Sequence, residues 1–298
     1  MTLLPDPALQ SPSLPAWWRR HPVVLRGVVP PDRRPTDPAA AFAGWCRPPA
    51  VARLYRLAGD EHPGGAGAAR VPVGELVDRG AALRDRGRPV TLLLNRVDAV
   101  DEGVRRLRDL LPVDLPWRLD GTVATLSDPG SGIGFHTGHE DGFIVQLAGA
   151  RRWSAWPPST VPDDHHLLVL GRPSADGVPP LLRSADPPHL TVELAPGDAL
   201  HVPALWPHEG VTLGDTPSLS LSIAWRGVNA RRLLARHLDD GQVGALGAAW
   251  YRLLPDVAAG DTGTLAALVA PLAADVGIDP ADVRAATDAL VAGAGLPA

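Results

Sequence analysis

The sequence predicts a mainly β protein, a barrel or sandwich of short antiparallel strands followed by a helical region. From Gly121 onward, short apolar runs are separated by turns rich in glycine and proline, a pattern typical of such folds. Residues 218–225 (SLSLSIAW) alternate small polar and apolar side chains with the period of two expected of a strand with one buried face. After Gly227 the apolar spacing becomes helical, so the clearest boundary in the chain lies near residue 228.

The part of the chain before this section is expected to mix loops, helices and strands. Residues 1–15 are a proline-rich arm, and residues 17–29 predict a short helix and then a strand. Residues 73–84 and 100–111 have apolar side chains at helical spacing, and a short strand is predicted between them at residues 90–94.

The strand section is expected to begin at residues 122–126 and to continue with a hairpin of residues 143–147 and 152–156. Residues 157–190 contain many prolines and aspartates, and we interpret them as an insertion or a long loop. A strand, a turn and a second strand are then predicted over residues 191–202.

Helices are predicted after the strand section, and each begins at a residue suited to cap it. Asn229 can cap the first helix, Asp261 or Thr262 the second, and Asp279 with Pro280 begins the last.

Composition excludes several classes of protein. A hydrophobic content of 45% and a charged content of 20% over 298 residues are typical of a globular chain. The net charge of −5 gives no basic footprint for nucleic acid, and Cys46, the single cysteine, excludes an internal disulfide and cysteine zinc fingers. No apolar run reaches membrane-spanning length, and residues 1–15 do not resemble a signal peptide, so we expect a cytoplasmic protein. All basic residues are arginine, which indicates a GC-rich bacterial genome.

Two histidines stand where predicted strands end. His136 follows a glycine-rich turn at residues 129–134, and His208 follows the strand at residues 199–202. Imidazole is a common ligand of iron, zinc and copper, and a barrel can bring residues 72 positions apart into one site. Considered singly, each histidine fits a hydrogen-bonded structural role at least as well.

The stretch SDPGSGIGFHTGHEDGFIVQLAGARRW resembles the first metal motif of JmjC-type Fe(II)/2-oxoglutarate oxygenases. It is most similar to the cupin-like ribosomal-oxygenase branch, whose members hydroxylate arginine or histidine side chains. In that motif a metal-binding histidine precedes a glutamine-glycine turn, a basic residue and an aromatic residue. The matching positions are His136, Gln146, Gly149, Arg151 and Trp153.

The stretch LAPGDALHVPALWPHEG resembles the second motif of the family, with His208 as the second metal-binding histidine. The start WWRRHPVVLRG resembles its opening strand, so the resemblance covers roughly residues 12–227. It implies a double-stranded β-helix, the jelly-roll of cupin and JmjC proteins, over residues 1–227 with flanking helices. Residues 228–298 then form a helical C-terminal region, which in this family commonly makes a homodimer; a bundle that covers one end of the barrel is the alternative.

The resemblance also implies roles for single residues. The two histidines would hold Fe(II), and Arg151 would clamp the distal carboxylate of 2-oxoglutarate, a task that suits a bidentate guanidinium. Ser127 matches a hydroxyl that helps to hold the same carboxylate. Ser220 and Ser222 lie on the late strand whose inward side chains face the metal and its cosubstrate.

One departure from the family motif concerns the metal. The family pattern is His-x-Asp…His, and this chain has Gly138 where the pattern has the aspartate. Three interpretations are open. Iron has two protein ligands and a chloride or water beside them, as in the related halogenases; or His139, Glu140 or Asp141 takes the position; or the site is degenerate. Position +4 on a strand shares the face of His136, which favours Glu140 among the neighbours.

Other side chains near the motifs have weaker claims. His139 and Asp141 are candidates for substrate contact, and His201 and Trp206 are candidates for the pocket wall, although plain packing explains each as well. The function that we expect is hydroxylation, or halogenation, of an unactivated C–H bond in an amino-acid, peptide or protein side-chain substrate. The alternatives are a catalytically silent cupin-like binding module and a site for copper or zinc.

Overall fold

The computed structural model describes residues 3, 4, 6, 11, 13–56, 67–115, 118–171, 181, 183–257 and 261–292. Among these residues the strands form an eight-stranded sheet and a three-stranded sheet, and every pairing is antiparallel. The strands are β1 (Val23–Leu25), β2 (Val51–Arg56), β3 (Gly67–Val71), β4 (Val90–Asn95), β5 (Leu119–Ser127), β6 (Glu140–Ala148), β7 (Ala150–Ala155), β8 (Leu190–Leu194), β9 (Ala199–Val202), β10 (His208–Leu213) and β11 (Ser218–Arg226).

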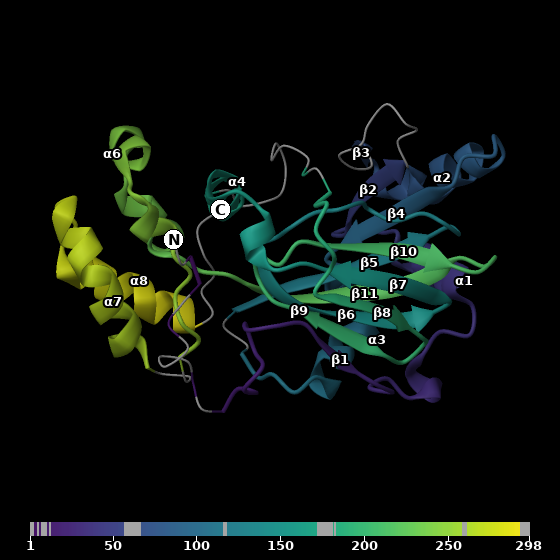
Figure 1. Cartoon of the computed structure of the whole chain (residues 1–298), viewed down its shortest axis with the longest axis horizontal. Coiled ribbons are helices and arrows are strands. Elements are labelled where there is room, and N and C mark those ends of the chain that lie inside the picture. Colours follow the sequence, from purple (N-terminus) through teal and green to yellow (C-terminus); the bar gives the residue numbers. More distant parts are fainter. Residues whose placement is uncertain are drawn as a thin grey trace.

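The order of the large sheet is β1-β9-β6-β11-β5-β4-β2-β3, and that of the small sheet is β10-β7-β8. In the view of Figure 1 the small sheet overlaps the middle strands of the large sheet, and residues of both sheets pack into one apolar cluster. This arrangement confirms the predicted mainly β fold with flanking helices.

The helices flank this pair of sheets and extend beyond it at one end, where α6, α7 and α8 lie beside the strands (Figure 1). They are α1 (Pro38–Trp45), α2 (Leu76–Arg84), α3 (Glu102–Arg106), α4 (Asp163–Leu170), α5 (Ala230–Leu233), α6 (Asp240–Ala245), α7 (Thr262–Asp275) and α8 (Pro280–Val291). The side chains of Asn229, Asp261 and Asp279 cap α5, α7 and α8, as the sequence predicts. Within the described residues, no helix combines the length and the apolar character needed to cross a membrane.

The main core lies on the face of the large sheet that is covered by the N-terminal segments. Trp18, Phe42, Phe143 and Leu221 are fully buried there, and β4 has five consecutive buried residues. A smaller apolar cluster, which includes Ile144, lies between the two sheets. The strands β5, β6 and β11 therefore bury one face in the main core and turn the other toward the small sheet.

Two local predictions were wrong. No helix forms at residues 17–22, which the structure describes as turns before β1; Arg19 adopts a left-handed conformation with φ of 59°, and this breaks the helical path. Residues 157–190, interpreted as a loop, contain α4. Two aspartates in its first turn interact favourably with the helix dipole and stabilise the helix, and Leu170 at its end is buried.

Candidate functional site

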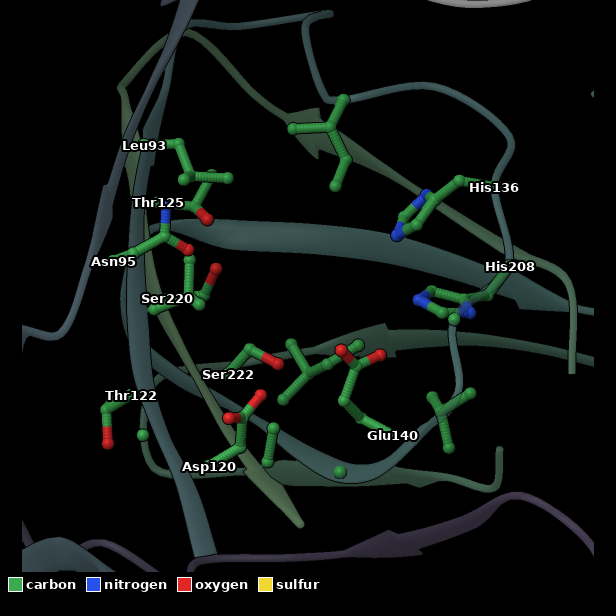
Figure 2. Close-up of a pocket in the computed structure, with 18 of the residues that line it drawn as sticks. Leu93, Asn95, Asp120, Thr122, Thr125, His136, Glu140, His208, Ser220 and Ser222 are labelled. Carbon is green, nitrogen blue, oxygen red and sulfur yellow. The ribbon is translucent and has the colours of Figure 1, made fainter. Parts of the chain in front are cut away.

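A cavity of about 570 Å³ opens between the two sheets. Its wall is formed by β5, β6 and β11 of the large sheet, by β7 and by the start of β10, and it also reaches β2 and β4. Figure 2 shows two histidines on one side of this space and the serines of β11 facing them across it. The cavity brings together most of the candidate site residues: His136, Gly138, Glu140, Arg151, His208, Ser220 and Ser222.

His136 and His208 are direct neighbours across a backbone bridge. The amide of His136 donates to the carbonyl oxygen of His208 (3.1 Å), and the amide of His208 donates to that of His136 (2.8 Å). Such a pair of reciprocal hydrogen bonds places two residues opposite each other with their side chains on one face. The ring centroids are 4.3 Å apart, so both imidazoles point into the same part of the cavity (Figure 2).

Each of these rings is held in one tautomer by a backbone carbonyl. Nδ1 of His136 donates to the oxygen of Gly134 (2.9 Å), and Nδ1 of His208 donates to the oxygen of Trp206 (2.8 Å). Because a carbonyl oxygen only accepts, the proton is on Nδ1 and the lone pair is on Nε2. Burial lowers the pKa of His136; burial and the neighbouring His136 lower the pKa of His208 to about 3. Both rings are therefore neutral near pH 7, which is the state that binds metal ions.

Arg151 comes from β7 and crosses the space between the sheets. Its side chain is buried, with Nη1 donating to Oγ of Ser220 and Nη2 to Oγ of Ser127, both at 3.1 Å. Nη2 also donates to the carbonyl oxygen of Gly210 at 3.5 Å, whereas Nε has no hydrogen-bond partner. Burial lowers the pKa of this guanidinium to about 10.

Among the described residues, the hydrogen-bond partners of the Arg151 guanidinium are neutral: two serine hydroxyls and one backbone carbonyl oxygen. A buried cation with only neutral partners is unfavourable, and proteins normally supply an anion at such a position. The buried guanidinium is therefore suited to bind an anionic group that enters the cavity.

The ring of Trp153 lies near both Arg151 and His208, and two glycines allow close packing beside it. The guanidinium lies 5.1 Å from the ring of Trp153, whose centroid is 6.0 Å from that of His208. Any side chain at Gly210 would meet the Trp153 ring at 2.7 Å. A side chain at Gly132 would overlap the carbonyl oxygen of Gly210, which explains a glycine in this turn.

Alternate residues of the segment 136–144 line the cavity. His136, Gly138 and Glu140 belong to this lining, whereas His139 and Asp141 do not. An added Cβ at Gly138 would lie 2.5 Å from Oε2 of Glu140, so the Glu140 carboxylate occupies the space above that glycine. Oε1 of Glu140 lies 3.3 Å from Nε2 of His139, and 33% of the Glu140 side chain is exposed.

In the described ranges, no cluster of three histidine, cysteine, aspartate or glutamate side chains is arranged to hold a metal ion. The two histidines therefore form the pair of converging donors, and Glu140 is on the same wall without closing a three-donor set.

Asp141 belongs to a buried ion-pair cluster behind the cavity wall. Its Oδ2 accepts from Nε of Arg19 at 2.7 Å and from Nη2 of Arg118 at 2.9 Å, and its Oδ1 accepts from the amide of Ala204. The two arginines hold the pKa of this fully buried carboxyl down at about 2. Asp141 therefore fastens β6 to neighbouring segments.

His201 and Trp206 lie outside the residues that line the cavity. The His201 ring is fully buried and packs against the rings of Trp17 and Trp18, with centroids 4.9 and 4.8 Å away. The Trp206 ring packs edge-on against His189 at 5.3 Å. Trp206 contributes to the site through its carbonyl oxygen, which orients His208.

Part of the cavity wall on β5 was not predicted from the sequence. Val123 and Thr125 line the cavity, and they lie on the same face of that strand as Ser127. The signal that identifies them is the two-residue period of a strand, counted back from Ser127.

Comparisons with known proteins agree with this architecture. Residues 114–233 match the JmjC domain family. Over 141 residues the chain is 32% identical to ribosomal protein uL16 3-hydroxylase of Escherichia coli (strain K12). That match covers 46% of this chain and 34% of the relative, so it spans about a third of the relative's length.

Solved structures of the E. coli ribosomal oxygenase YcfD are similar in fold. An X-ray structure of YcfD gives a TM-score of 0.57 at 22% identity and covers 92% of this chain and 69% of that chain. YcfD with cobalt and succinic acid gives 0.54, and YcfD with cobalt and 2-oxoglutarate gives 0.53, each at 22% identity over 92% of this chain and 68% of that chain. The similarity confirms the predicted double-stranded β-helix class.

Proposed function

Because residues 114–233 match the JmjC domain family, we propose that this chain is an Fe(II)- and 2-oxoglutarate-dependent oxygenase. The observation on which the proposal depends is the buried guanidinium of Arg151, which lies on the wall of the cavity that also holds the histidine pair. The family match supplies the reaction class, and the chain's own residues supply the fit to each component.

The cosubstrate site is assigned to Arg151 with the hydroxyls of Ser127 and Ser220. A dicarboxylate such as 2-oxoglutarate brings the anion that the buried guanidinium lacks, and the two serines orient the guanidinium toward it. Nε of Arg151, which has no hydrogen-bond partner, provides one further donor for an incoming oxygen. Ser222, one alternation along β11, lines the same wall and would contact the bound cosubstrate or substrate.

The metal site is assigned to Nε2 of His136 and Nε2 of His208. Neutral imidazoles held by second hydrogen bonds are suited to iron, and in YcfD cobalt is bound together with 2-oxoglutarate or succinic acid. Bound iron would couple oxidation of 2-oxoglutarate by O2, with release of succinate and CO2, to insertion of one oxygen atom into a C–H bond. The protein's part is to orient both reactants and to exclude bulk water from the space between the sheets.

The substrate that we propose is a side chain of a protein or peptide. The relative with 32% identity acts on ribosomal protein uL16, as its name states. In this chain the cavity wall includes the ion pair of Asp120 and Arg226 on neighbouring strands, which offers polar groups to an entering side chain. Hydroxylation is the proposed outcome, and chlorination is the alternative, which succinate formation that depends on chloride in the assay below would favour.

The experiment is 2-oxoglutarate turnover by the full chain with Fe(II), with and without chloride, measured as succinate formed. We expect succinate formation that depends on Fe(II) and is lost in His208→Ala and in Arg151→Met. Binding of 2-oxoglutarate to the cobalt-loaded protein, measured by calorimetry, is the second readout, and it should be lost in Arg151→Met. Absence of both turnover and 2-oxoglutarate binding in the unaltered chain contradicts the proposal.

A second candidate function is a catalytically silent module that binds a small anion. The observation that favours it is the lack, in the described part of the chain, of a ready three-donor metal cluster. Such a module binds 2-oxoglutarate or a similar dicarboxylate through Arg151 without metal and forms no succinate. Equal affinity for 2-oxoglutarate with and without cobalt, together with no turnover, would support this candidate.

A further inference from the structure

We propose that Glu140 supplies the carboxylate donor that Gly138 cannot provide, and that position 138 is a glycine because the Glu140 carboxylate lies over it. The inference rests on the proposed function and deepens it, because it assigns a third protein group to the metal. It also selects the outcome of the reaction: hydroxylation, with no place for a halide.

The first step concerns which acidic side chain reaches the cavity. Along the segment that carries His136, every second residue lines the cavity, and Glu140 is the acidic residue on that face. Asp141 points to the opposite side, where Arg19 and Arg118 hold it in buried ion pairs. A triad built on His139 and Asp141 would require β6 to give up these contacts. Figure 2 shows Glu140 entering the same space as the two imidazole rings.

The second step concerns the volume above Gly138. A Cβ there would lie 2.5 Å from Oε2 of Glu140, a distance that real Cβ atoms essentially never show. The backbone at this position is fixed, because the carbonyl oxygen of Gly138 accepts from the amide of Leu205 (2.8 Å), three residues before His208. A side chain at position 138 would therefore require the carboxylate end of Glu140 to move away, whereas the glycine leaves that volume to Glu140.

The third step concerns reach. Glutamate has one methylene more than aspartate, and this length brings the Glu140 carboxylate back over a residue two positions earlier in the chain, just before β6 begins. Its present polar contact is with His139 at 3.3 Å, and a third of the side chain is exposed to the cavity. The proposal requires the Glu140 side chain to rotate about its own bonds, from its contact with His139 toward the two imidazoles that line the same cavity.

The fourth step concerns charge. A halide beside a metal needs an empty, uncharged volume next to the two histidines. Here that volume already contains a carboxylate, which brings the negative charge itself and repels a second anion. Glycine at position 138 therefore leaves room for the Glu140 carboxylate and not for chloride.

The test is Co(II) binding to the metal-free full chain, measured by calorimetry and by the visible absorption of bound Co(II). Glu140→Gln should weaken binding by roughly 10–100-fold, the range found when contacts around a metal are removed. Gly138→Ala removes no donor atom, yet its Cβ displaces the carboxylate, and a loss of about tenfold or more is expected. The double variant Gly138→Asp with Glu140→Ala should restore affinity to within about tenfold of the unaltered chain.

Matched controls separate this effect from general damage. Gly142→Ala changes the next cavity-facing residue of the same strand, where an added Cβ would meet its nearest atom at 3.4 Å. Glu193→Gln removes an exposed carboxylate that pairs with Arg152. Both should bind Co(II) as the unaltered chain does, and thermal melting of every variant reports whether it folds.

The outcomes distinguish the inference from the function on which it rests. Loss of Co(II) binding in His208→Ala with unchanged binding in Glu140→Gln and Gly138→Ala overturns the inference and leaves the proposed function standing. A Co(II) spectrum of the unaltered chain that changes with chloride overturns it as well. An unaltered chain that binds neither Co(II) nor 2-oxoglutarate overturns both. Chloride sensitivity that appears only in Glu140→Ala supports the inference.

Discussion

Arg151 is expected to stabilise the ligand-bound state and to destabilise the empty protein. Burial lowers the pKa of its guanidinium from 12.5 to about 10, which corresponds to about 3 kcal/mol of cost for the charged form. Arg151→Met keeps a long apolar stem and removes the charge, at the loss of hydrogen bonds to two serines. We expect the free energy of unfolding of the empty protein to rise by about 1–3 kcal/mol, as when buried ions are replaced by apolar side chains.

The assay is urea denaturation of the metal-loaded protein, with Co(II) as the metal, in the absence and presence of 2-oxoglutarate. At a ligand concentration of 100 times the dissociation constant, the unaltered chain should gain about 2.7 kcal/mol. The Arg151→Met variant should gain nothing from the ligand, because the group that binds the distal carboxylate is gone. The two proteins should therefore exchange their order of stability when 2-oxoglutarate is added.

Arg152→Met is the matched control for this prediction. It changes the next residue of the same strand, whose exposed guanidinium pairs with the exposed carboxylate of Glu193. Surface pairs of this kind contribute about 0–1 kcal/mol, so the variant should keep its response to 2-oxoglutarate. A destabilised Arg151→Met protein that still gains stability from 2-oxoglutarate would refute the reasoning about the buried charge.

Three further predictions concern the supports of the cavity. Asp141→Asn leaves two buried arginines without one of their carboxylates, and urea denaturation should show a loss of about 3–5 kcal/mol in the free energy of unfolding. The exposed control Asp109→Asn should change this free energy by less than about 0.5 kcal/mol. Equal losses in the two variants would contradict the structural role of Asp141. Burial lowers the pKa of His201 from 6.5 to about 4, so the folded state favours the neutral ring. The contribution of this group to the free energy of unfolding is fully present above pH 6.5. It falls by up to about 3 kcal/mol as the pH drops from 6.5 to 4. His201→Gln should remove this part of the pH dependence in urea denaturation, and identical pH profiles would exclude it. Gly132→Ala pushes a methyl group into a backbone carbonyl and should lower the free energy of unfolding by about 1–3 kcal/mol or more. In the control Gly74→Ala the methyl group meets open space, and no comparable loss is expected.

The two-residue period of strands was the most informative feature of the sequence. It predicted β11 from residues 218–225, and the structure places Ser220 and Ser222 of that strand on the cavity wall. The same period favoured Glu140 over its neighbours, and the structure places Glu140 on the wall that carries His136. A period of two survives in the sequence wherever one face of a strand is apolar and the other polar, so it can be read without coordinates.

The orientation of His201 could not be predicted, because its strand lacks this alternation of polar and apolar residues. All four residues of β9 are buried, so the strand has no polar face against which the direction of His201 could be judged. Its packing against Trp17 and Trp18 depends on a segment more than 180 positions away in the sequence. A strand that is buried on both faces gives no alternation to read, and only the tertiary contacts decide which face holds which ring.

The change of sequence character near residue 228 does not coincide with a break in the contacts. The amide of Gly227 donates to the carbonyl oxygen of His139 (3.0 Å), which precedes Glu140 on β6. Beyond that boundary, Asp256 accepts from Nε1 of Trp18 (2.7 Å) and pairs with Arg19, which in turn holds Asp141. The helical region therefore contributes a buried carboxylate to the ion-pair cluster directly behind the cavity strand. Because β6 carries Glu140 on one face and Asp141 of this cluster on the other, the helical region helps to hold the backbone of the strand that lines the cavity.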